Sequence, residues 1–260
     1  MNEYGLVSVI TPTWNCAAFI CETIRSVQAQ TYQNWEMIIS DDCSTDNTRE
    51  QIEPYLKADS RIKYICNPKN SGAAITRNNA LRRAQGKWIA FLDSDDLWHP
   101  KKLEMQIRFM VENGYHFSYT EYVEMDEIGK ETGVLISGPK HVSRRGMYNF
   151  CWPGCLTVMY DREHVGLLQI ADIKKNNDYA IRLQLYKKQG TEAHLLKENL
   201  ALYRVRKVSI SHDKFKRKFK SHYDLFHMCD EKPAVVAMWY ACWNMWYGLL
   251  KKRNYEKVIV

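Results

Sequence analysis

The sequence predicts an α/β fold: a mostly parallel central sheet flanked by helices, followed by a helical extension at the C-terminal end. Short apolar runs alternate with amphipathic stretches of helical length over the first half of the chain. Strands that alternate with helices of this length indicate right-handed crossovers between parallel strands. The 260 residues, 45% of them hydrophobic, are enough for one sizeable core.

Hydrophobic periodicity places each element of the first half. Side chains at Phe19, Ile20, Ile24 and Val27 recur at helical spacing, so their segment forms an amphipathic helix. Short continuous apolar runs predict buried strands of a parallel sheet. The expected strands are residues 7–11, 35–40, 61–66 and 88–92; the expected helices are 18–30, 46–57 and 72–84, with another starting near Pro100.

Composition argues against several classes of protein. Eight cysteines stand at irregular spacings without a CxxC pair or a Cys/His cluster, so neither a disulfide framework nor a structural zinc site is expected. The formal net charge is +7, but no RNA-binding signature, zinc finger or helix-turn-helix pattern accompanies it, so no nucleic-acid partner is expected. The first residues have no basic or apolar region of a signal peptide, which predicts a cytoplasmic protein.

An acidic cluster, Asp93-Ser94-Asp95-Asp96, follows the apolar run of residues 88–92. Ligands of open α/β sheets bind beyond the carboxyl ends of the strands. Clustered carboxylates suit Mg²⁺ or Mn²⁺ that carries the phosphates of a substrate. The plainer alternative is an Asp-rich turn that leads into a helix. The position of the cluster favours a substrate activated by a nucleotide.

Polar side chains follow two further strands. The first expected strand runs into Thr-Pro-Thr at residues 11–13, and the second runs into Asp41 and Asp42. A carboxylate at a strand end can accept hydrogen bonds from a base or a ribose. Neither a G-x-G-x-x-G sequence after the first strand nor a P-loop is present, so the phosphates would be held mainly by a metal. The three strand ends are expected to form one pocket.

Four segments, taken together, resemble a known family. They read VSVITPTWN at residues 7–15, IISDDCSTD at 38–46, NSGAAITRN at 70–78 and FLDSDD at 91–96. In this order and spacing they resemble the motifs of family-two glycosyltransferases, whose GT-A fold has a Rossmann-like sheet. The resemblance covers roughly the first 110 residues, and a weaker one continues to about residue 211.

The resemblance implies a division of the chain. Residues 1–211 would form the catalytic domain, with a nucleotide-sugar-binding half at 1–98 and an acceptor-binding half at 99–211. Residues 212–260 would form a basic and aromatic helical extension. The Gln-x-x-Arg-Trp signature of processive relatives is absent, which favours transfer of one sugar per encounter.

The resemblance also implies roles for individual residues in binding the nucleotide diphosphate sugar. Residues Thr11, Pro12 and Thr13 would border the nucleoside. Either Asp41 or Asp42 would meet the base. The base or diphosphate would be approached by Arg77, whose alternative role is that of an ordinary helix residue. An Asp-x-Asp motif, Asp93, Ser94 and Asp95, would bracket ribose, diphosphate and a Mn²⁺ or Mg²⁺ ion, with Asp95 as metal ligand. The ion would neutralise charge on the leaving diphosphate.

Inverting transfer needs a base for the proton of the attacking hydroxyl. The family supplies the Asp of a Glu-Asp pair before an amphipathic helix, and the matching residue here is Asp178. The usual Glu is replaced by Asn177, which is a departure from the pattern. Otherwise Asp178 would be an N-terminal helix residue favoured by the helix dipole. Asp172 is the second candidate for the base.

Two segments of the acceptor half are open to more than one interpretation. Trp152 either forms an aromatic platform for a sugar ring or lies in a turn before a strand at residues 156–160. Residues 203–211 resemble the family segment that closes the site, where basic side chains can approach the diphosphate.

The C-terminal segment 234–250 reads as an apolar and aromatic helix. It is shorter than the roughly 20 residues that span a membrane. One interpretation is internal packing or homodimerisation. The other is peripheral contact with an anionic membrane, because Trp and Tyr lie near the basic stretch 214–220.

The expected function is metal-dependent inverting transfer of one sugar, from a donor such as a UDP-sugar to a glycan acceptor. The product would be a linkage of a bacterial surface polysaccharide such as O-antigen, capsule or lipooligosaccharide, and the acceptor would be linked to polyprenyl diphosphate. A cytoplasmic enzyme would then work at the inner face of the membrane. The alternatives are a sugar-phosphate nucleotidyltransferase, and a catalytically silent nucleotide-sugar-binding scaffold for which Asn177 is the hint.

Overall fold

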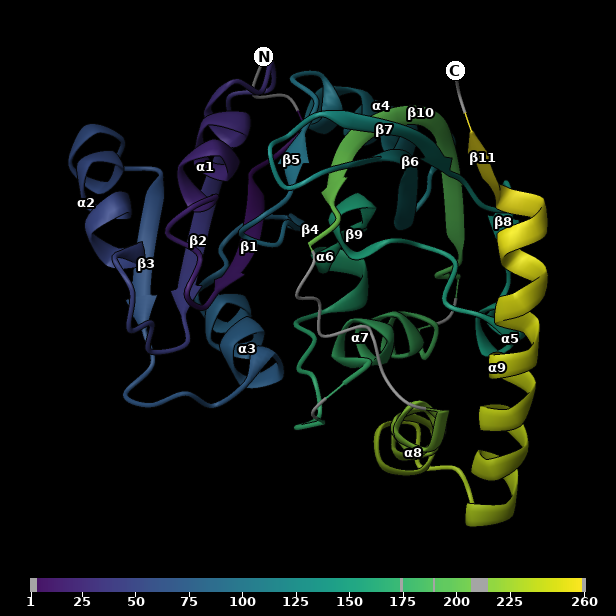
Figure 1. Ribbon diagram of the computed structural model, residues 1–260. Helices are drawn as coiled ribbons and strands as arrows, with labels where there is room; N and C mark the ends of the chain where they lie inside the picture. The colour runs from purple at the N-terminus through teal and green to yellow at the C-terminus, as the bar shows by residue number, and fades with distance from the viewer. Residues whose placement is uncertain (1–3, 174, 189, 207–214, 259–260) are drawn as a thin grey trace.

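One central sheet with helices on both faces forms the body of the protein, and a long C-terminal helix lies along its side (Figure 1). The computed structural model describes residues 4–173, 175–188, 190–206 and 215–258. The predicted α/β class is confirmed. Both halves of the chain contribute strands to this one sheet, so segments that are distant in sequence lie side by side.

The N-terminal half contains the parallel part of the sheet. Its strands are β1 (Val7–Thr13), β2 (Trp35–Asp41), β3 (Ile62–Cys66) and β4 (Trp88–Phe91). They lie in the order β3-β2-β1-β4, and each neighbouring pair is parallel. The crossovers are α1 (Ile20–Gln28), α2 (Thr48–Ala58) and α3 (Ala73–Arg83), and α4 (Lys102–Asn113) follows. All these elements lie within two residues of the predicted ranges.

Successive side chains along each strand point to opposite faces of the sheet and pack into two separate cores. Val9 and Ile39 pack in a cluster with side chains of α1, α2 and α4. Ile10 and Ile38 point to the opposite face and pack with α3 and with residues of the C-terminal half. Because successive strand residues point to opposite faces, burial on both faces requires continuous apolar runs. This explains why the first-half strands were recognisable.

The C-terminal half makes the sheet mixed. Beyond β4, the order continues β9-β6-β7-β11 through antiparallel pairs, whereas β10 runs parallel to β6. The parallel arrangement is thus concentrated in the first half. The additional strands are β5 (Leu97–Trp98), β6 (Phe117–Met125), β7 (Glu131–Ile136), β8 (His141–Val142), β9 (Met159–Asp161), β10 (Ala193–Arg204) and β11 (Glu256–Val258).

The predicted strand at residues 156–160 is only partly correct. Its first residues lie in a 3₁₀ turn, Cys155–Thr157, and the strand is β9. The backbone N–H of Thr157 donates to the carbonyl oxygen of Gly154 at 3.1 Å, and its hydroxyl donates to the same oxygen at 2.8 Å. These local bonds satisfy the backbone without a partner strand, which a hydrophobic pattern does not reveal.

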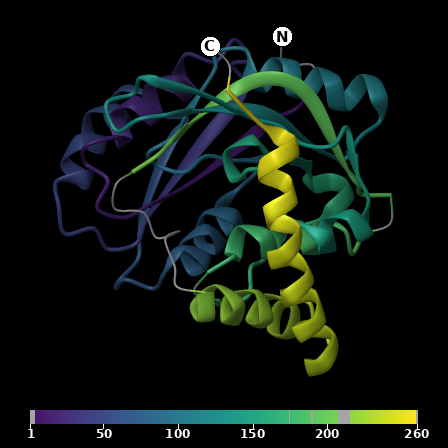
Figure 2. The ribbon, with the colours of Figure 1, turned by 45° about the vertical axis from the view of Figure 1, so that its right-hand side comes forward.

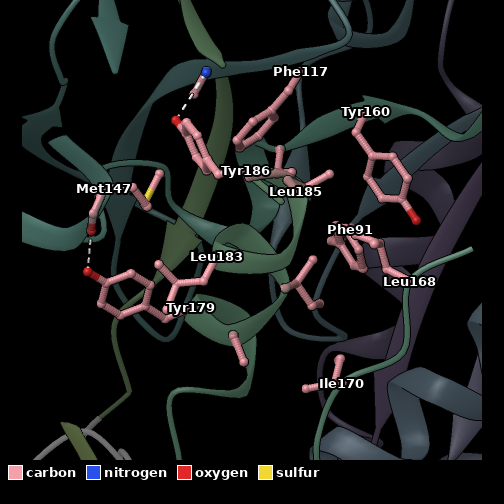
Figure 3. Close-up of a cluster of buried hydrophobic side chains, with 14 of the residues drawn as sticks. Phe91, Phe117, Met147, Tyr160, Leu168, Ile170, Tyr179, Leu183, Leu185 and Tyr186 are labelled. Atoms are coloured by element: carbon pink, nitrogen blue, oxygen red, sulfur yellow. Dashed lines mark hydrogen bonds between the residues drawn. The ribbon is translucent and has the colours of Figure 1, made fainter. Parts of the chain in front are cut away.

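Short helices surround the second core in the C-terminal half. They are α5 (Arg144–Asn149), α6 (Arg162–Val165) and α7 (Asn177–Leu185). Helix α7 contributes Tyr179 and Leu183 to a cluster that also holds Phe91 and Phe117 (Figure 3). The Tyr179 hydroxyl donates to the carbonyl oxygen of Met147 on α5. The orientation of α7 is therefore fixed by packing on several sides.

The C-terminal extension consists of α8 (Phe215–Asp224), a π-helical turn (Leu225–Cys229), α9 (Ala234–Tyr255) and the strand β11. It is helical as expected, but β11 also pairs with β7, so the extension continues the central sheet. All eight cysteines are free in the structure. Within the described residues, the structure has no helix with the length and apolar character needed to cross a membrane.

A close backbone approach at Gly86 gives a test of this packing. A Cβ atom there would stand 2.7 Å from the Leu6 carbonyl oxygen and from the Ser8 nitrogen, both backbone atoms of the β1 region. Gly86→Ala should lower the free energy of unfolding by about 1–3 kcal/mol, because backbone cannot yield as a side chain can. Urea unfolding followed by circular dichroism measures the change.

Gly146→Ala is the matched control. A Cβ at Gly146 would meet only the side chains of Val142 and Ser143, at 3.3 and 3.6 Å. Equal unfolding midpoints for the two variants would contradict the close approach at Gly86.

Candidate active site

Three loops at the carboxyl ends of β1, β2 and β4 are tied together by hydrogen bonds. The Asp42 nitrogen donates to the Thr13 carbonyl oxygen at 2.9 Å, which joins the first two loops. The Cys16 thiol donates to the Ser94 carbonyl oxygen at 3.2 Å, which joins the first to the third. The expected convergence of three polar strand ends is therefore present in the structure.

The end of β1 provides the first wall of the site. Thr11 and Thr13 are buried, and the structure gives their hydroxyl oxygens no hydrogen-bond partner among the residues it describes. Pro12 between them is partly exposed. The role of these three residues in bordering a nucleoside remains a prediction, and Pro12 is the one that a ligand can reach directly.

Asp41 and Asp42, at the end of β2, are buried and turned toward neighbouring loops. Asp41 accepts hydrogen bonds from the backbone and hydroxyl of Ser44 and from the Tyr64 hydroxyl, at 2.6–2.9 Å. Asp42 accepts from the nitrogens of Ser71 and Gly72, at 2.8 and 2.7 Å. Their carboxylates organise the loops around the site. Contact of either one with a base remains a prediction.

Gly72 has a positive φ of +87° directly before α3. Glycine adopts this conformation without the cost that a side chain would add. In this turn the N–H groups of Ser71 and Gly72, directly before α3, donate to the Asp42 carboxylate. This explains a glycine in the motif at residues 70–78.

The acidic turn after β4, residues 93–96, is held in place by hydrogen bonds from α1 and β10. The Thr23 hydroxyl lies 2.9 Å from the Ser94 carbonyl oxygen and 3.0 Å from that of Asp96. The buried Asp96 carboxylate accepts from the Arg204 nitrogen at 2.9 Å. Asp96 is thus a structural residue of the turn. The carboxylates of Asp93 and Asp95 remain partly exposed.

Arg204 and Arg206, in the segment predicted to close the site, form polar contacts with the acidic turn. Arg204 is buried and donates to the Asp95 carbonyl oxygen at 2.8 Å and to the Glu22 carboxylate at 2.6 Å. Arg206 lies 3.3 Å from the Asp95 carboxylate. Arg204 therefore positions the turn, and Arg206 is the basic group beside the Asp95 carboxylate. Residues 207–211 of the predicted segment lie outside the described residues.

Arg77 connects the two halves of the site. It is buried on α3, and its Nη2 atom lies 2.6 Å from Oδ1 of Asp93. Its Nη1 atom donates to the side-chain oxygen of Asn177, the first residue of α7. The predicted approach of Arg77 to a base or diphosphate remains a prediction. The contacts present join the acidic turn to the helix that carries Asp178.

Asp178 lies at the start of α7 with 39% of its side chain exposed, so a substrate can reach it. Its Oδ2 atom is 2.9 Å from Nη1 of the buried Arg182, one turn along the helix. Burial alone would raise the pKa of Asp178, but the charges of Arg182 and Arg77 outweigh it and hold that pKa below its ordinary value. Asp178 is therefore ionised at neutral pH.

Two other candidate residues lie elsewhere. Asp172 is exposed and lines a hollow of about 400 Å³ with residues of α8, including Lys220 and Asp224. Trp152 is buried and packs edge to face against Tyr255 of α9, at 4.9 Å between ring centroids. Trp152 thus joins the extension to the body and is no exposed platform for a sugar.

The acidic turn fits a divalent cation that is shared with a substrate. Burial, followed by the charge of Asp93, raises the pKa of Asp95, and a cation between the two carboxylates would relieve this repulsion. Across the residues that the structure describes, no group of three His, Cys, Asp or Glu side chains could hold a metal. Mg²⁺ and similar ions are commonly bound through one or two carboxylates and completed by substrate phosphates. Asp93 and Asp95 suit this arrangement.

Arg182 is the residue at this site that the sequence reasoning missed. It is buried, and its Nε atom is without a hydrogen-bond partner among the described residues. The available signal was its spacing of four residues from Asp178 within an expected helix, because side chains at that spacing meet on one face.

Comparison with known proteins identifies the family of the chain. The model of the family described as glycosyl transferase family 2 matches residues 8–147, which includes the three strand-end loops and Arg77. The chain is 45% identical over 92% of its length to the putative teichuronic acid biosynthesis glycosyltransferase TuaG of Bacillus subtilis, and covers 94% of it. It is 38% identical to WfgD of Escherichia coli, covering 90% of each chain. WfgD is named as a UDP-Glc:alpha-D-GlcNAc-diphosphoundecaprenol beta-1,3-glucosyltransferase.

Solved structures share the fold at low sequence identity. S. aureus TarS 1–349, in complex with UDP-GlcNAc, matches 95% of this chain and 74% of its own with a TM-score of 0.72 and 19% identity. The mannosyltransferase PcManGT from Pyrobaculum calidifontis, in complex with GDP-Man and Mn²⁺, matches 95% of this chain and 75% of its own. Its TM-score is 0.63 and its identity 16%. These likenesses support the expected GT-A fold.

The ion pair of Asp178 and Arg182 predicts a pH-dependent contribution to stability. A carboxylate whose pKa is lowered by folding stabilises the folded state above its unfolded pKa, and loses this contribution as pH falls through the folded pKa. Asp178→Asn should therefore unfold at lower urea than the wild type at pH 7, with a difference that shrinks below about pH 4. Urea midpoints measured from pH 7 to pH 3 test this.

Asp172→Asn is the control because Asp172 is an exposed aspartate. It should leave the midpoint close to that of the wild type at each pH. A constant difference between Asp178→Asn and the wild type down to pH 3 would show that the ion pair does not stabilise the fold.

Proposed function

The chain belongs to glycosyl transferase family 2, and from this premise we propose that it transfers one sugar from a UDP-sugar to a lipid-linked glycan. The observation that carries the proposal is the link through Arg77 between Asp93 of the acidic turn and Asn177 beside Asp178. It brings a donor-binding group and a candidate base into one connected site.

The donor would lie against the acidic turn and the ends of β1 and β2. A UDP-sugar is supported by the name of WfgD and by the UDP-GlcNAc complex of TarS. In this chain, Arg206 at 3.3 Å from Asp95 supplies positive charge next to the turn. Asp95, with Asp93, would hold a Mn²⁺ or Mg²⁺ ion, and such an ion stabilises negative charge on a departing diphosphate.

Asp178 would act as the general base. Its carboxylate is ionised at neutral pH and partly exposed, so it can accept the proton of an acceptor hydroxyl as the oxygen attacks the anomeric carbon. The bond to the new oxygen forms as the bond to the diphosphate breaks, and the nucleoside diphosphate leaves with the electron pair. A single displacement of this kind inverts the anomeric configuration. Arg182 holds the base in position throughout.

The acceptor would be a glycan linked to polyprenyl diphosphate, during assembly of a bacterial surface polysaccharide such as O-antigen, capsule or lipooligosaccharide. The names of two relatives support this class of acceptor and product. WfgD is named for a diphosphoundecaprenol-linked acceptor, and TuaG is named for teichuronic acid biosynthesis. Such acceptors are anchored in a membrane. A cytoplasmic enzyme would meet them peripherally, at the inner face of the membrane.

The nucleotidyltransferase alternative is set aside because the family match assigns glycosyl transfer. The scaffold alternative depended on the loss of the usual Glu at Asn177. In the structure, Asn177 accepts a hydrogen bond from Arg77, so the substitution leaves the connection between the two halves intact. Turnover measurements separate the two remaining possibilities.

Asp178→Asn should reduce sugar transfer by about 10³-fold, because general bases contribute roughly 10²–10⁴-fold. UDP binding should be retained, since Asp178 belongs to the acceptor side of the site. Transfer is measured as UDP release from a panel of UDP-sugars with a short-chain prenyl-diphosphate-linked sugar as acceptor.

Asp172→Asn is the matched control for the second candidate base. Loss of transfer in Asp172→Asn with activity kept in Asp178→Asn would assign the base to Asp172. A wild type without turnover on any donor, yet with UDP binding, would favour the scaffold.

Asp95→Asn tests the metal site. Mn²⁺ should raise the melting temperature of the wild type in the presence of UDP, and this increase should largely disappear in Asp95→Asn because a ligand oxygen and a charge are lost. Differential scanning fluorimetry with UDP, GDP, CDP and dTDP, each with and without Mn²⁺, also identifies the nucleotide. Glu112→Gln, an exposed change on α4, is the control. An equal metal-dependent shift in Asp95→Asn would remove Asp95 from the metal site.

A further inference from the structure

The outer face of α9 exposes bulky apolar side chains. Val235 is 74% exposed, Met238 48%, Trp239 56% and Trp246 52%. Half of the large apolar side chains that are exposed in the described residues lie between positions 228 and 246. Scattered apolar residues on a surface need no explanation, but a contiguous group of this kind marks an interaction site.

Helix α9 exposes several of its largest apolar side chains, whereas an ordinary surface helix buries them. Its inner face packs through the fully buried Ala237 and Ala241, and Tyr240 and Tyr247 beside them also pack against the core. Asn244 on the same side donates to the Tyr179 hydroxyl at 2.7 Å. The large residues Trp239 and Trp246 recur at helical spacing on the other side, toward solvent. The core of the protein therefore does not account for the aromatic face.

The exposed rings of Trp239 and Trp246 form a continuous row with the half-buried ring of Trp243 between them. The ring centroids of Trp239 and Trp243 lie 5.6 Å apart with the rings nearly parallel, and those of Trp243 and Trp246 lie 5.1 Å apart. Residues 234–248 contain no charged side chain at all. Tryptophan in this setting is typical of a membrane–water interface, where an apolar ring and a polar N–H are both accommodated.

Positive charge accompanies the row of tryptophans. Arg144 and Arg145 at the start of α5 are exposed, and they line a hollow of about 610 Å³ together with Trp239 and Trp243. The residues that line this hollow include no carboxylate. The exposed Lys218 of α8 adds a basic residue before the row in the sequence. The combined surface is apolar, aromatic and cationic.

We propose that this surface, the outer face of α9 together with Arg144 and Arg145, binds an anionic membrane, with α9 lying at the headgroup level. Acidic headgroups complement the two arginines, and the indole rings enter the interface. A second copy of the chain is a poorer occupant. A two-fold contact places the same patch against itself, so the basic residues around it would face one another.

Membrane binding here would bring α7, the helix that carries the proposed base Asp178, close to a lipid-linked substrate. The inner face of α9 holds α7 through Asn244 and Tyr179, and α8 is joined to α7 by a bond of 3.3 Å from Asn176 to Ser221. The two helices of the extension, α8 and α9, pack against each other (Figure 2), and each forms a hydrogen bond with α7 or its N-cap residue. This benefit rests on the proposed function, whereas membrane binding itself can be measured without any substrate.

Co-sedimentation of the full chain with sucrose-loaded vesicles tests the proposal. The wild type should bind vesicles of phosphatidylcholine with 30% phosphatidylglycerol, and bind pure phosphatidylcholine about tenfold more weakly. Trp246→Ala should reduce binding to the anionic vesicles several-fold, and Trp239→Ala combined with Trp246→Ala about tenfold or more. Trp14→Ala is the matched control, because Trp14 and Trp246 are both 52% exposed.

The charge contribution is tested with a pair of arginine variants. Arg144→Gln combined with Arg145→Gln should weaken binding to the anionic vesicles about tenfold, with little effect on binding to pure phosphatidylcholine. Arg82→Gln combined with Arg83→Gln is the control, since this pair is also adjacent and exposed, at the end of α3. Thermal unfolding and the UDP-dependent shift confirm that every variant is folded.

The outcomes separate this inference from the proposed function. Absence of wild-type binding to anionic vesicles, or equal binding by the double tryptophan variant, would overturn the membrane site while UDP-dependent transfer could persist. A wild-type dimer that the tryptophan changes dissociate, without vesicle binding, would assign the surface to a second copy. Retained vesicle binding without transfer on any donor would leave the membrane site standing and contradict the proposed function.

Discussion

The buried guanidinium of Arg77 is the constraint on which the rest of the site depends. A charge removed from water is tolerated only when partners surround it, and the loss of one partner leaves a costly buried ion. Arg77 has Asp93 on one side, 2.6 Å away, and Asn177 on the other. Its partners come from the acidic turn and from a helix one hundred residues distant. The N-terminal and C-terminal halves of the chain are thereby held together at this site.

The carboxylates around the site divide into those that build it and those that face outward. Asp42 and Asp96 are buried and accept backbone hydrogen bonds, so they fix the start of α3 and the acidic turn. Asp93, Asp95 and Asp178 keep exposed surface and lie beside arginines. The buried hydrogen bonds fix these loops, so the exposed carboxylates are already in place before a substrate binds. Electrostatic catalysis benefits from such preorganisation, because the charges need not rearrange during the reaction.

The sequence predicted the N-terminal half well because its strands are buried on both faces and its turns are polar. Continuous apolar runs and strand-end motifs are local signals, and they located β1, β2 and β4 together with their loops. The C-terminal half depends on contacts between distant segments. The burial of Trp152 against Tyr255 and the pairing of β11 with β7 could not be read from either segment alone. For the same reason, sequence placed Arg77 in the site but did not reveal Asn177 as its partner.

Asn177 shows how a departure from a family pattern can be compatible with the site. Two buried arginines, Arg77 and Arg182, face the carboxylates of Asp93 and Asp178, so the charges balance within the chain. A glutamate at position 177 would add a third negative charge at the junction. The amide oxygen of Asn177 accepts the hydrogen bond of Arg77 without that charge. The substitution therefore preserves the link between the two halves and leaves Arg182 as the direct partner of Asp178, which argues for a working base in place of a vestigial one.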